Sequence, residues 1–207
     1  MSKKFRCAQC LAEITASKSK CSSCKFDNSK IKLIRSAVPP GTLLDGRYYV
    51  GNTLGQGGFG ITYRGFDEDL SRLVAIKEHY PKHIVDRADN GLDVIPSNNA
   101  EFKAGLNKFT DEARALARFQ GHPNIVSVLS YFQSYKTAFM VMEYIEGRTV
   151  REILKGGKTF PAEDAIETII PVLEGLKACH DTNLIHRDLT PDNIYITSSG
   201  QVKILDF

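Results

Sequence analysis

The chain has 207 residues, of which 42% are hydrophobic and 25% are charged. These proportions are ordinary for a globular protein and exclude a chain that is disordered throughout. No stretch approaches the ~18 apolar residues that a transmembrane helix needs, and a Cys pair stands where a signal peptide would have its apolar run. We therefore expect no membrane span, no export and a cytoplasmic protein. Residues 1–38 hold nine Lys or Arg and two Asp or Glu, although the net charge is only +3, and this asymmetry predicts two units with different surfaces.

Four of the five cysteines form the pairs Cys7-x2-Cys10 and Cys21-x2-Cys24, ten residues apart. Two such turns can present four thiolates to one tetrahedral Zn²⁺, and four Cys ligands leave no position for a water molecule, so we predict a structural zinc ribbon over residues 1–35. Two disulfides are the alternative, which an exported chain would favour. A protein partner of the ribbon is expected rather than nucleic acid, because its basic surface includes few aromatic side chains for base stacking.

A Pro/Gly-rich linker is predicted at residues 36–46, and an α+β domain follows it. Residues 82–100 are polar and are expected to form a long loop. Apolar residues at helical spacing predict helices over 102–116 and 163–180, with a short helix at 149–156. Alternating or apolar runs predict strands at 48–54, 61–67, 72–80, 125–132, 137–145, 193–197 and 202–207.

A glycine-rich turn, Gly55–Gly60, connects two of these strands, where backbone N–H groups can approach phosphate oxygens closely. A glycine-rich hairpin without a ligand is the alternative. Lys77 follows the apolar run Val74-Ala75-Ile76, and its ammonium group can pair with phosphates if an acid holds it. Glu112, on the following helix, is the candidate acid; an exposed lysine at a strand end is the alternative.

The most specific segment is HRDLTPDN at residues 186–193. Asp188 can accept a proton from an attacking hydroxyl group, while Asn193 and Asp206 offer the hard oxygen ligands that Mg²⁺ prefers. Each acid alone could equally be a turn or cap residue. The order in which all of these residues occur argues against coincidence.

On these motifs the sequence resembles the eukaryotic-type protein kinases of the Ser/Thr class, and in particular their bacterial members. The resemblance covers roughly residues 46–207 and is carried by GQGGFGIT, VAIK, the Glu112 segment DEARALARF, HPNIV, VMEYIEG, HRDLTPDN and DF. It implies a protein-kinase-like fold with a five-stranded N-lobe and helix C at 47–142, a hinge at 143–149 and a partial C-lobe at 150–207.

The resemblance also implies ATP and Mg²⁺ as cofactors and gives roles to the matching residues. Asp188 would be the catalytic base, Lys77 would hold phosphates and pair with Glu112, and Asn193 and Asp206 would bind Mg²⁺. The ATP-binding residues would be Leu54, Gly55, Gln56, Gly57, Gly58, Phe59, Gly60, Thr62, Ala75, Lys77, Glu143, Ile145 and Tyr195.

Three departures from the family pattern bear on function. Thr62 replaces the usual Val over adenine, and Thr190 stands where Ser/Thr kinases usually have a Lys that contacts the γ-phosphate. The sequence ends at Asp206-Phe207, before the glycine and activation segment of the family, so we expect a truncated kinase chain.

These features predict an ATP-dependent kinase that phosphorylates Ser or Thr hydroxyls of a protein substrate. A nucleotide-binding pseudokinase or scaffold with a zinc-ribbon interaction module is the alternative, favoured by Thr190 and by the missing segment. A small-molecule kinase of the antibiotic-modifying type is disfavoured by Arg187, because those enzymes usually lack the arginine of the catalytic loop.

Overall fold

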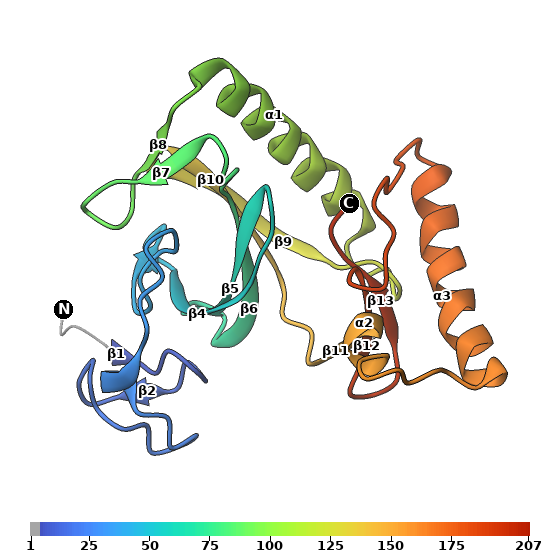
Figure 1. Cartoon of the computed structure of the whole chain (residues 1–207), viewed down its shortest axis with the longest axis horizontal. Helices are drawn as coiled ribbons and strands as arrows, with labels where there is room; N and C mark the ends of the chain where they lie inside the picture. The colour runs from blue at the N-terminus through green and yellow to red at the C-terminus, as the bar shows by residue number, and fades with distance from the viewer. Residues whose placement is uncertain (1–4) are drawn as a thin grey trace. The chain divides into compact units, whose positions relative to one another are not determined.

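The computed structural model describes residues 5–207, and its helices and strands are labelled in Figure 1. The chain divides into two compact units. The first contains residues up to Asp111 together with Ser130–Tyr144, and the second contains Glu112–Leu129 together with Ile145–Phe207. No helix among residues 5–207 combines the length and the apolar content that crossing a bilayer would require.

The first unit is built on a six-stranded sheet with the strand order β3-β4-β5-β6-β10-β9. Buried and half-buried residues alternate along the whole of β5, the pattern that a strand with one face against a core predicts. The five strands expected from the sequence are all present, and the two-residue β3 extends the sheet beside β4. The strands are β3 (Leu43–Leu44), β4 (Tyr48–Gln56), β5 (Gly60–Asp67), β6 (Arg72–His79), β9 (Val128–Ser134) and β10 (Thr137–Glu143).

Helix α1 (Asn99–Leu116) follows the sheet strands β4–β6 and continues into a short 3-10 helix, η2 (Ala117–Phe119). Most of its apolar stripe is buried, as the helical spacing predicted. The rings of Phe102 and Phe109 lie 5.2 and 5.6 Å from the ring of His79, at the end of β6. This aromatic cluster joins the helix to the strand that carries Lys77.

We expect the first unit to lose stability as the pH falls from about 6.5 to about 4, because of His79. Its imidazole is buried, and Nε2 has no hydrogen-bond partner within the described chain. Burial, reinforced by the charge of Lys77, lowers the pKa of His79 to about 4. The unfolded chain takes up this proton at a higher pH than the folded chain, so acid favours unfolding, by up to ~3 kcal/mol.

Thermal unfolding near pH 7 and near pH 4.5 would measure this effect in the unmodified protein and in the His79→Gln variant. The variant should lose less stability on acidification. A variant with His180→Gln, at an exposed position in the second unit, serves as the control and should retain the full pH dependence. Equal pH dependence in all three proteins would show that His79 is not the group responsible.

Residues 82–100 contain more structure than the sequence predicted. We expected a long loop, but β7 (Val85–Arg87) and β8 (Val94–Pro96) pair as an antiparallel hairpin. The turn contains Asn90, and Gly91 adopts a φ of 72°, which favours glycine. Three-residue strands with polar residues between them are too short to give a detectable alternating pattern, which is why the prediction of a loop was wrong.

The second unit is built on a three-stranded sheet, β11-β12-β13, and on α3. Asn124 lies in the loop between η2 and β9, and its Nδ2 donates a hydrogen bond of 3.1 Å to the main-chain oxygen of Val202. This bond holds the loop against β13. The core consists of Val150, Val172, Ile194, Val202 and Ile204. The elements are β11 (Gly147–Thr149), α2 (Val150–Ile153), α3 (Ala162–His180), β12 (Ile194–Thr197) and β13 (Val202–Ile204).

One face of α3 is apolar and exposed. Ile166, Ile169, Ile170 and Leu173 are 43–57% accessible to solvent. Cys179, at the other end of the same helix, is fully buried, as expected for a core thiol, and burial raises its pKa to about 11. The helix therefore contributes only its opposite face to the core of the second unit.

Candidate functional site

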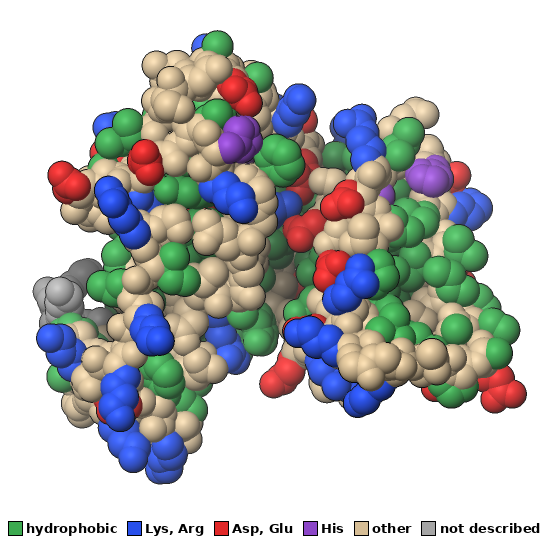
Figure 2. Space-filling model, viewed as in Figure 1, with side chains coloured by type: hydrophobic (Ala, Val, Ile, Leu, Met, Phe, Trp, Pro, Cys, Tyr) green, Lys and Arg blue, Asp and Glu red, His purple; other side chains and the backbone are tan. Residues whose placement is uncertain are grey.

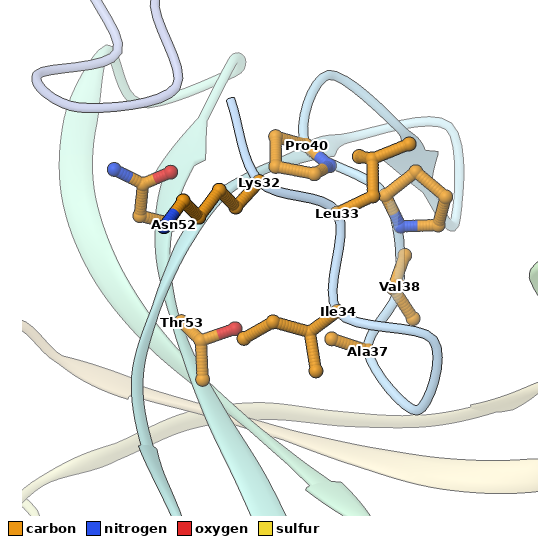
Figure 3. Close-up of a pocket in the computed structure, with 9 residues that line it drawn as sticks. Lys32, Leu33, Ile34, Ala37, Val38, Pro40, Asn52 and Thr53 are labelled. Carbon is orange, nitrogen blue, oxygen red and sulfur yellow. The ribbon is translucent and has the colours of Figure 1, made fainter. Parts of the chain in front are cut away.

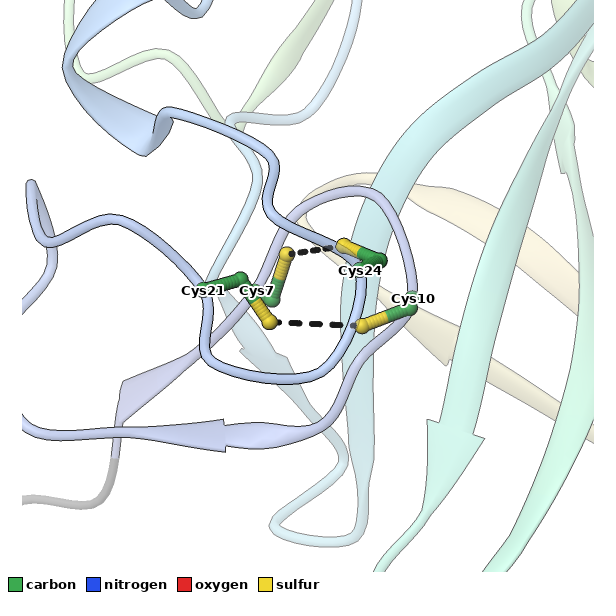
Figure 4. Close-up of side chains that lie close together, drawn as sticks. All are labelled: Cys7, Cys10, Cys21 and Cys24. Carbon is green, nitrogen blue, oxygen red and sulfur yellow. Dashed lines mark hydrogen bonds between the residues drawn. The ribbon is translucent and has the colours of Figure 1, made fainter.

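The four N-terminal cysteines lie together in the first unit (Figure 4). Their Sγ atoms are all within 4.8 Å of one another. The Cys7–Cys24 and Cys10–Cys21 sulfur distances are 3.7 and 3.6 Å. A tetrahedral ion with metal–sulfur bonds of ~2.3 Å requires sulfur–sulfur distances of ~3.8 Å, so the four thiols fit one Zn²⁺. These distances are too long for disulfides, and all four cysteines are free.

Two matching turns hold the cysteines in this arrangement. The N–H groups of Leu11 and Lys25 donate to the carbonyl oxygens of Cys7 and Cys21, at 2.8 and 3.0 Å. The backbone N–H of Cys24 lowers the pKa of Cys21 to about 6, whereas burial raises the pKa of Cys10 to about 12. A bound cation would therefore be needed to hold Cys10 as a thiolate near neutral pH. The surrounding elements are β1 (Phe5–Arg6), β2 (Glu13–Ile14) and the 3-10 helix η1 (Asn28–Lys30).

The cysteine segment packs against strands β4 and β5 of the sheet. The N–H of Asn52 donates to the main-chain oxygen of Ala8 at 2.8 Å, and Arg64 Nη1 donates to that of Gln9 at 3.0 Å. At Gly51 a Cβ atom would lie 2.8 Å from the oxygen of Ala8, so the close approach requires glycine. The segment and the sheet thus share a hydrogen-bonded interface.

Arg6 anchors this interface. Most basic side chains of the N-terminal segment are exposed, and Figure 2 shows several of them on its surface at lower left. The side chain of Arg6 is only 9% accessible, pairs with Glu68, and lies 3.8 Å from the centre of the Phe66 ring. A second ring, that of Tyr49, is 5.2 Å away. Among the described basic residues of this segment, Arg6 is therefore the one whose side chain is covered by the sheet.

We expect the purified protein to contain one zinc ion for each chain, bound by the four cysteines. Elemental analysis would find this ion in the unmodified protein and in a Cys179→Ser variant, because Cys179 lies outside the cluster. Cys10→Ser should reduce the zinc content strongly, since structural zinc sites use four protein ligands. Zinc-free protein with two disulfides would contradict the prediction.

The glycine-rich turn lies at the tips of β4 and β5, as predicted. Residues 57–59 are exposed, and the carbonyl oxygen of Phe59 accepts the N–H of Tyr80 at 2.9 Å. A Cβ atom at Gly60 would lie 2.7 Å from the main-chain oxygen of Glu78. Glycine is therefore required at this position, where β5 starts directly beside β6.

Lys77 lies in the middle of the sheet, directly across from Thr62 on β5 and from Met140 on β10. Its Nζ atom is 6.0 Å from the centre of the Phe109 ring of α1. Ala75, two residues earlier on the same strand, is paired with Met142. The predicted phosphate-contacting lysine and two predicted adenine-contacting residues, Thr62 and Ala75, therefore occupy neighbouring positions of one sheet.

In the second unit, Asp188 and Asn193 are held together. Asn193 Nδ2 donates to the main-chain oxygen of Asp188 at 2.8 Å and to its carboxylate Oδ2 at 3.3 Å. The main-chain oxygen of Asn193 accepts the N–H of Leu205 at 2.9 Å, next to Asp206. Asn193 is buried, while both aspartates are exposed. Because the amide nitrogen of Asn193 is bonded to Asp188, its Oδ1 atom is the one suited to ligate a cation.

His186 is a further residue of this loop, to which the sequence gave no role of its own. Its Nε2 lies 2.9 Å from the main-chain oxygen of Leu205, and its ring centre is 4.4 Å from that of Phe207. Arg187 and Asp206 have φ values of 65° and 55°, in the left-handed region. The histidine thus connects the 186–193 loop to the segment that presents Asp206.

The remaining predicted ATP-site residues are distributed over both units. Leu54, Gly55 and Gln56 lie at the exposed end of β4, and Glu143 is the last residue of β10, in the first unit. Glu112, Ile145 and Tyr195 belong to the second unit. Tyr195 is on β12, paired with Thr149 of β11.

A separate hollow in the first unit contains none of these residues (Figure 3). It has a volume of about 240 Å³ and is formed between residues 32–40 and Asn52 and Thr53 of β4. Figure 3 shows apolar side chains, including Leu33, Ile34 and Val38, around the opening. The hollow is a feature of the segment that leads into the sheet and is not part of the predicted ATP site.

Comparison with known proteins places the sequence among kinases. The family model described as the protein kinase domain matches residues 48–207. A probable serine/threonine-protein kinase of Streptomyces coelicolor is 36% identical over 168 residues, which cover 79% of this chain and 22% of the relative. The serine/threonine-protein kinase PknL of Mycobacterium tuberculosis is 38% identical over 165 residues, covering 80% and 37% respectively. The chain thus spans between about a fifth and two fifths of these relatives.

Among solved structures, the apo form of PpkA-294 matches with a TM-score of 0.77 and 31% sequence identity, over 83% of this chain and 61% of that chain. This likeness and the family match confirm the α+β, protein-kinase-like fold expected from the motifs.

Proposed function

Because the chain belongs to the protein kinase family, we propose that the protein transfers the γ-phosphate of ATP to Ser or Thr hydroxyl groups of proteins. The observation that carries the proposal is the pairing of Asp188 with Asn193, together with the hydrogen bond that Leu205, next to Asp206, donates to the main-chain oxygen of Asn193. The relatives named as serine/threonine-protein kinases support the choice of substrate class.

The first group of proposed roles concerns ATP. The exposed glycine-rich turn presents backbone N–H groups to phosphate oxygens, and the Lys77 ammonium binds the α- and β-phosphates, with Glu112 as its proposed acidic partner. Thr62 and Ala75, together with Leu54 and Tyr195, would contact adenine. The backbone of Glu143 and Ile145 would hydrogen-bond to the ring edge.

In the second unit, the proposed chemistry starts at Asp188. Its carboxylate orients the substrate hydroxyl group and accepts its proton, while the hydroxyl oxygen bonds to the γ-phosphorus and the bond to the ADP oxygen breaks. The hydrogen bond from Asn193 holds this carboxylate in place. Mg²⁺, bound by Asn193 Oδ1 and Asp206, would neutralise charge on the phosphates. Catalysis would then rest on positioning and electrostatics.

A nucleotide-binding scaffold without turnover is the second candidate. Thr190 favours it, because Ser/Thr kinases usually place a phosphate-contacting lysine there. Lys77, Asp188, Asn193 and Asp206 are all retained, however, and a scaffold has no need of the acid at position 188. For the N-terminal segment we propose a structural zinc ribbon that binds a protein partner, and the reduced thiols fit a cytoplasmic location.

The test is an Asp188→Asn variant in a transfer assay with γ-labelled ATP and a mixture of proteins as acceptors. We expect a loss of transfer of about 100-fold or more, because this removes the proposed base. Asp192→Asn is the matched control, since Asp192 lies in the same loop but pairs with Arg151 on the surface. Binding of ATP without any transfer by the unmodified protein would instead support the scaffold.

A further inference from the structure

A fully buried ion pair lies directly beside Lys77. Glu78 is the next residue on β6, and because successive side chains of a strand point to opposite faces, it projects into the other side of the sheet. Glu78 and Arg87 are 0% and 1% accessible at their side chains. Both guanidinium nitrogens Nη1 and Nη2 donate to the two carboxylate oxygens, each at 2.7 Å. The pair therefore has the two-pronged geometry that fixes orientation as well as distance.

All five N–H donors of Arg87 are used. Besides the two bonds to Glu78, Nε and Nη2 donate to the main-chain oxygen of Ser36 at 3.0 and 2.6 Å, and Nη1 donates to that of Leu92 at 2.8 Å. Lysine has three donors on one nitrogen and cannot reproduce this planar pattern. Arg87 thus connects β6 to the β7–β8 hairpin and to the segment that leads into the sheet.

Tyr63 brings β5 into the same network. Its hydroxyl group donates to Glu78 Oε2 at 2.6 Å and accepts the N–H of Val38 at 3.0 Å. Tyr63 is fully buried, and burial, together with the charge of Glu78, raises its pKa far above the usual value, so it remains a donor. The carboxylate of Glu78 therefore has a donor from β5 as well as the two from Arg87.

The network lies where β5 and β6 carry the proposed ATP contacts. Tyr63 follows Thr62, which is paired with Lys77, and Glu78 follows Lys77 itself. Lys77 and Glu78 flank one planar peptide unit, so a main-chain shift at Glu78 also displaces the main chain at Lys77. The main-chain oxygen of Glu78 also lies against Gly60, at the end of the glycine-rich turn.

We propose that Arg87 is a positioning residue for ATP: through Glu78 and Tyr63 it fixes the orientation of Lys77 and the end of the glycine-rich turn. The inference rests on the proposed kinase function and gives the β7–β8 hairpin a part in it. If Arg87 had only a structural role, its loss would lower the stability of the protein and leave its ATP affinity unchanged. The test must therefore measure ATP affinity separately from stability.

Arg47 provides a matched control in the same sheet. It forms a second two-pronged pair, with Asp67, at 2.8 and 2.7 Å, and Asp67 is as buried as Glu78. Asp67 is paired with Arg72, five residues along β6 from Lys77, a separation of about 17 Å. Loss of this pair should therefore affect stability without reaching the proposed ATP contacts.

The experiment compares Arg87→Lys and Arg47→Lys in the whole protein. The dissociation constant of a fluorescent ATP analogue and the KM for ATP are measured well below the melting temperature, which is determined for each variant. We expect both variants to melt at lower temperature, but only Arg87→Lys to weaken ATP binding, by about tenfold or more. Unchanged ATP affinity in a folded Arg87→Lys variant would overturn the proposal.

Two further measurements keep the result decisive. If Arg87→Lys does not fold, Tyr63→Phe is used instead, because it removes one hydroxyl group and keeps the ring; a threefold or larger loss of ATP affinity is expected, and none would overturn the proposal. If the unmodified protein binds no ATP, the proposed function fails as well. If it binds ATP and transfers phosphate but Arg87→Lys does so equally well, only the positioning role is wrong.

Discussion

Lys77→Met should reduce phosphate transfer by about 100-fold or more, the usual effect of removing one preorganised electrostatic contact from a reacting group. Methionine has a similar length, so the fold should be preserved while the ammonium group is lost. Lys77 lies between two neighbouring strands, opposite Thr62 and Met140, and this fixed backbone position is what makes its charge effective. Asp206→Asn should reduce phosphate transfer to a similar extent, because it removes a charged ligand of the proposed Mg²⁺.

The assay compares these variants with Lys103→Met, at an exposed position of α1. All three proteins should melt within a few degrees of the unmodified protein, and only Lys103→Met should keep its transfer activity. Retained activity in Lys77→Met would mean that another cation contacts the phosphates, and the proposed role of Lys77 would then be wrong.

The sequence predicted those parts of the molecule that depend on short, regular patterns. Alternation located β4, β5 and β6, and helical spacing located the buried stripe of α1. The spacing of the two Cys pairs also predicted that four sulfur atoms would meet, because each CxxC turn brings its own two cysteines together. In each case one local rule is enough to place the residues.

What could not be predicted depends on contacts between distant segments. Arg87 lies in a segment that we expected to be a loop, and nothing in its sequence neighbourhood indicates that Ser36 and Glu78 would surround it. Arg6 was likewise one of nine basic residues in the N-terminal part, and the composition suggested a separate basic unit. Only the fold shows that its side chain is covered by Phe66 and paired with Glu68.

Removal of the metal should lower the stability of the kinase sheet as well as that of the ribbon, because the two share the interface that Arg6 anchors. A segment with so small a core depends on its metal for folding, since structural zinc contributes ~10–16 kcal/mol in comparable small modules. The cluster formed by Cys7, Cys21 and Ile14 is the main apolar centre of this segment. Without the ion we expect residues 5–27 to unfold.

Only part of the folding free energy contributed by zinc stabilises the sheet. This part acts through the contacts of Arg6 and the hydrogen bond from Asn52 to Ala8. The charge-assisted contact of Arg6 contributes ~1.5–3 kcal/mol and a neutral backbone bond somewhat less, so β4 and β5 should become less stable by a few kcal/mol but remain folded. The amide proton of Asn52 is a direct reporter, because its acceptor belongs to the ribbon. Its hydrogen exchange should become fast when the metal is chelated.

Two variants separate metal binding from coupling to the sheet. Cys7→Ser should lose zinc and the protection of the Asn52 amide together, whereas Arg6→Ala should keep zinc but lose part of that protection, because it removes the anchor and leaves the four thiols in place. Ser23→Ala, an exposed change between Cys21 and Cys24, should behave like the unmodified protein. If the Asn52 amide stays protected in zinc-free Cys7→Ser, the ribbon and the sheet fold independently, and the contacts of Arg6 contribute nothing to the sheet on which the proposed ATP residues lie.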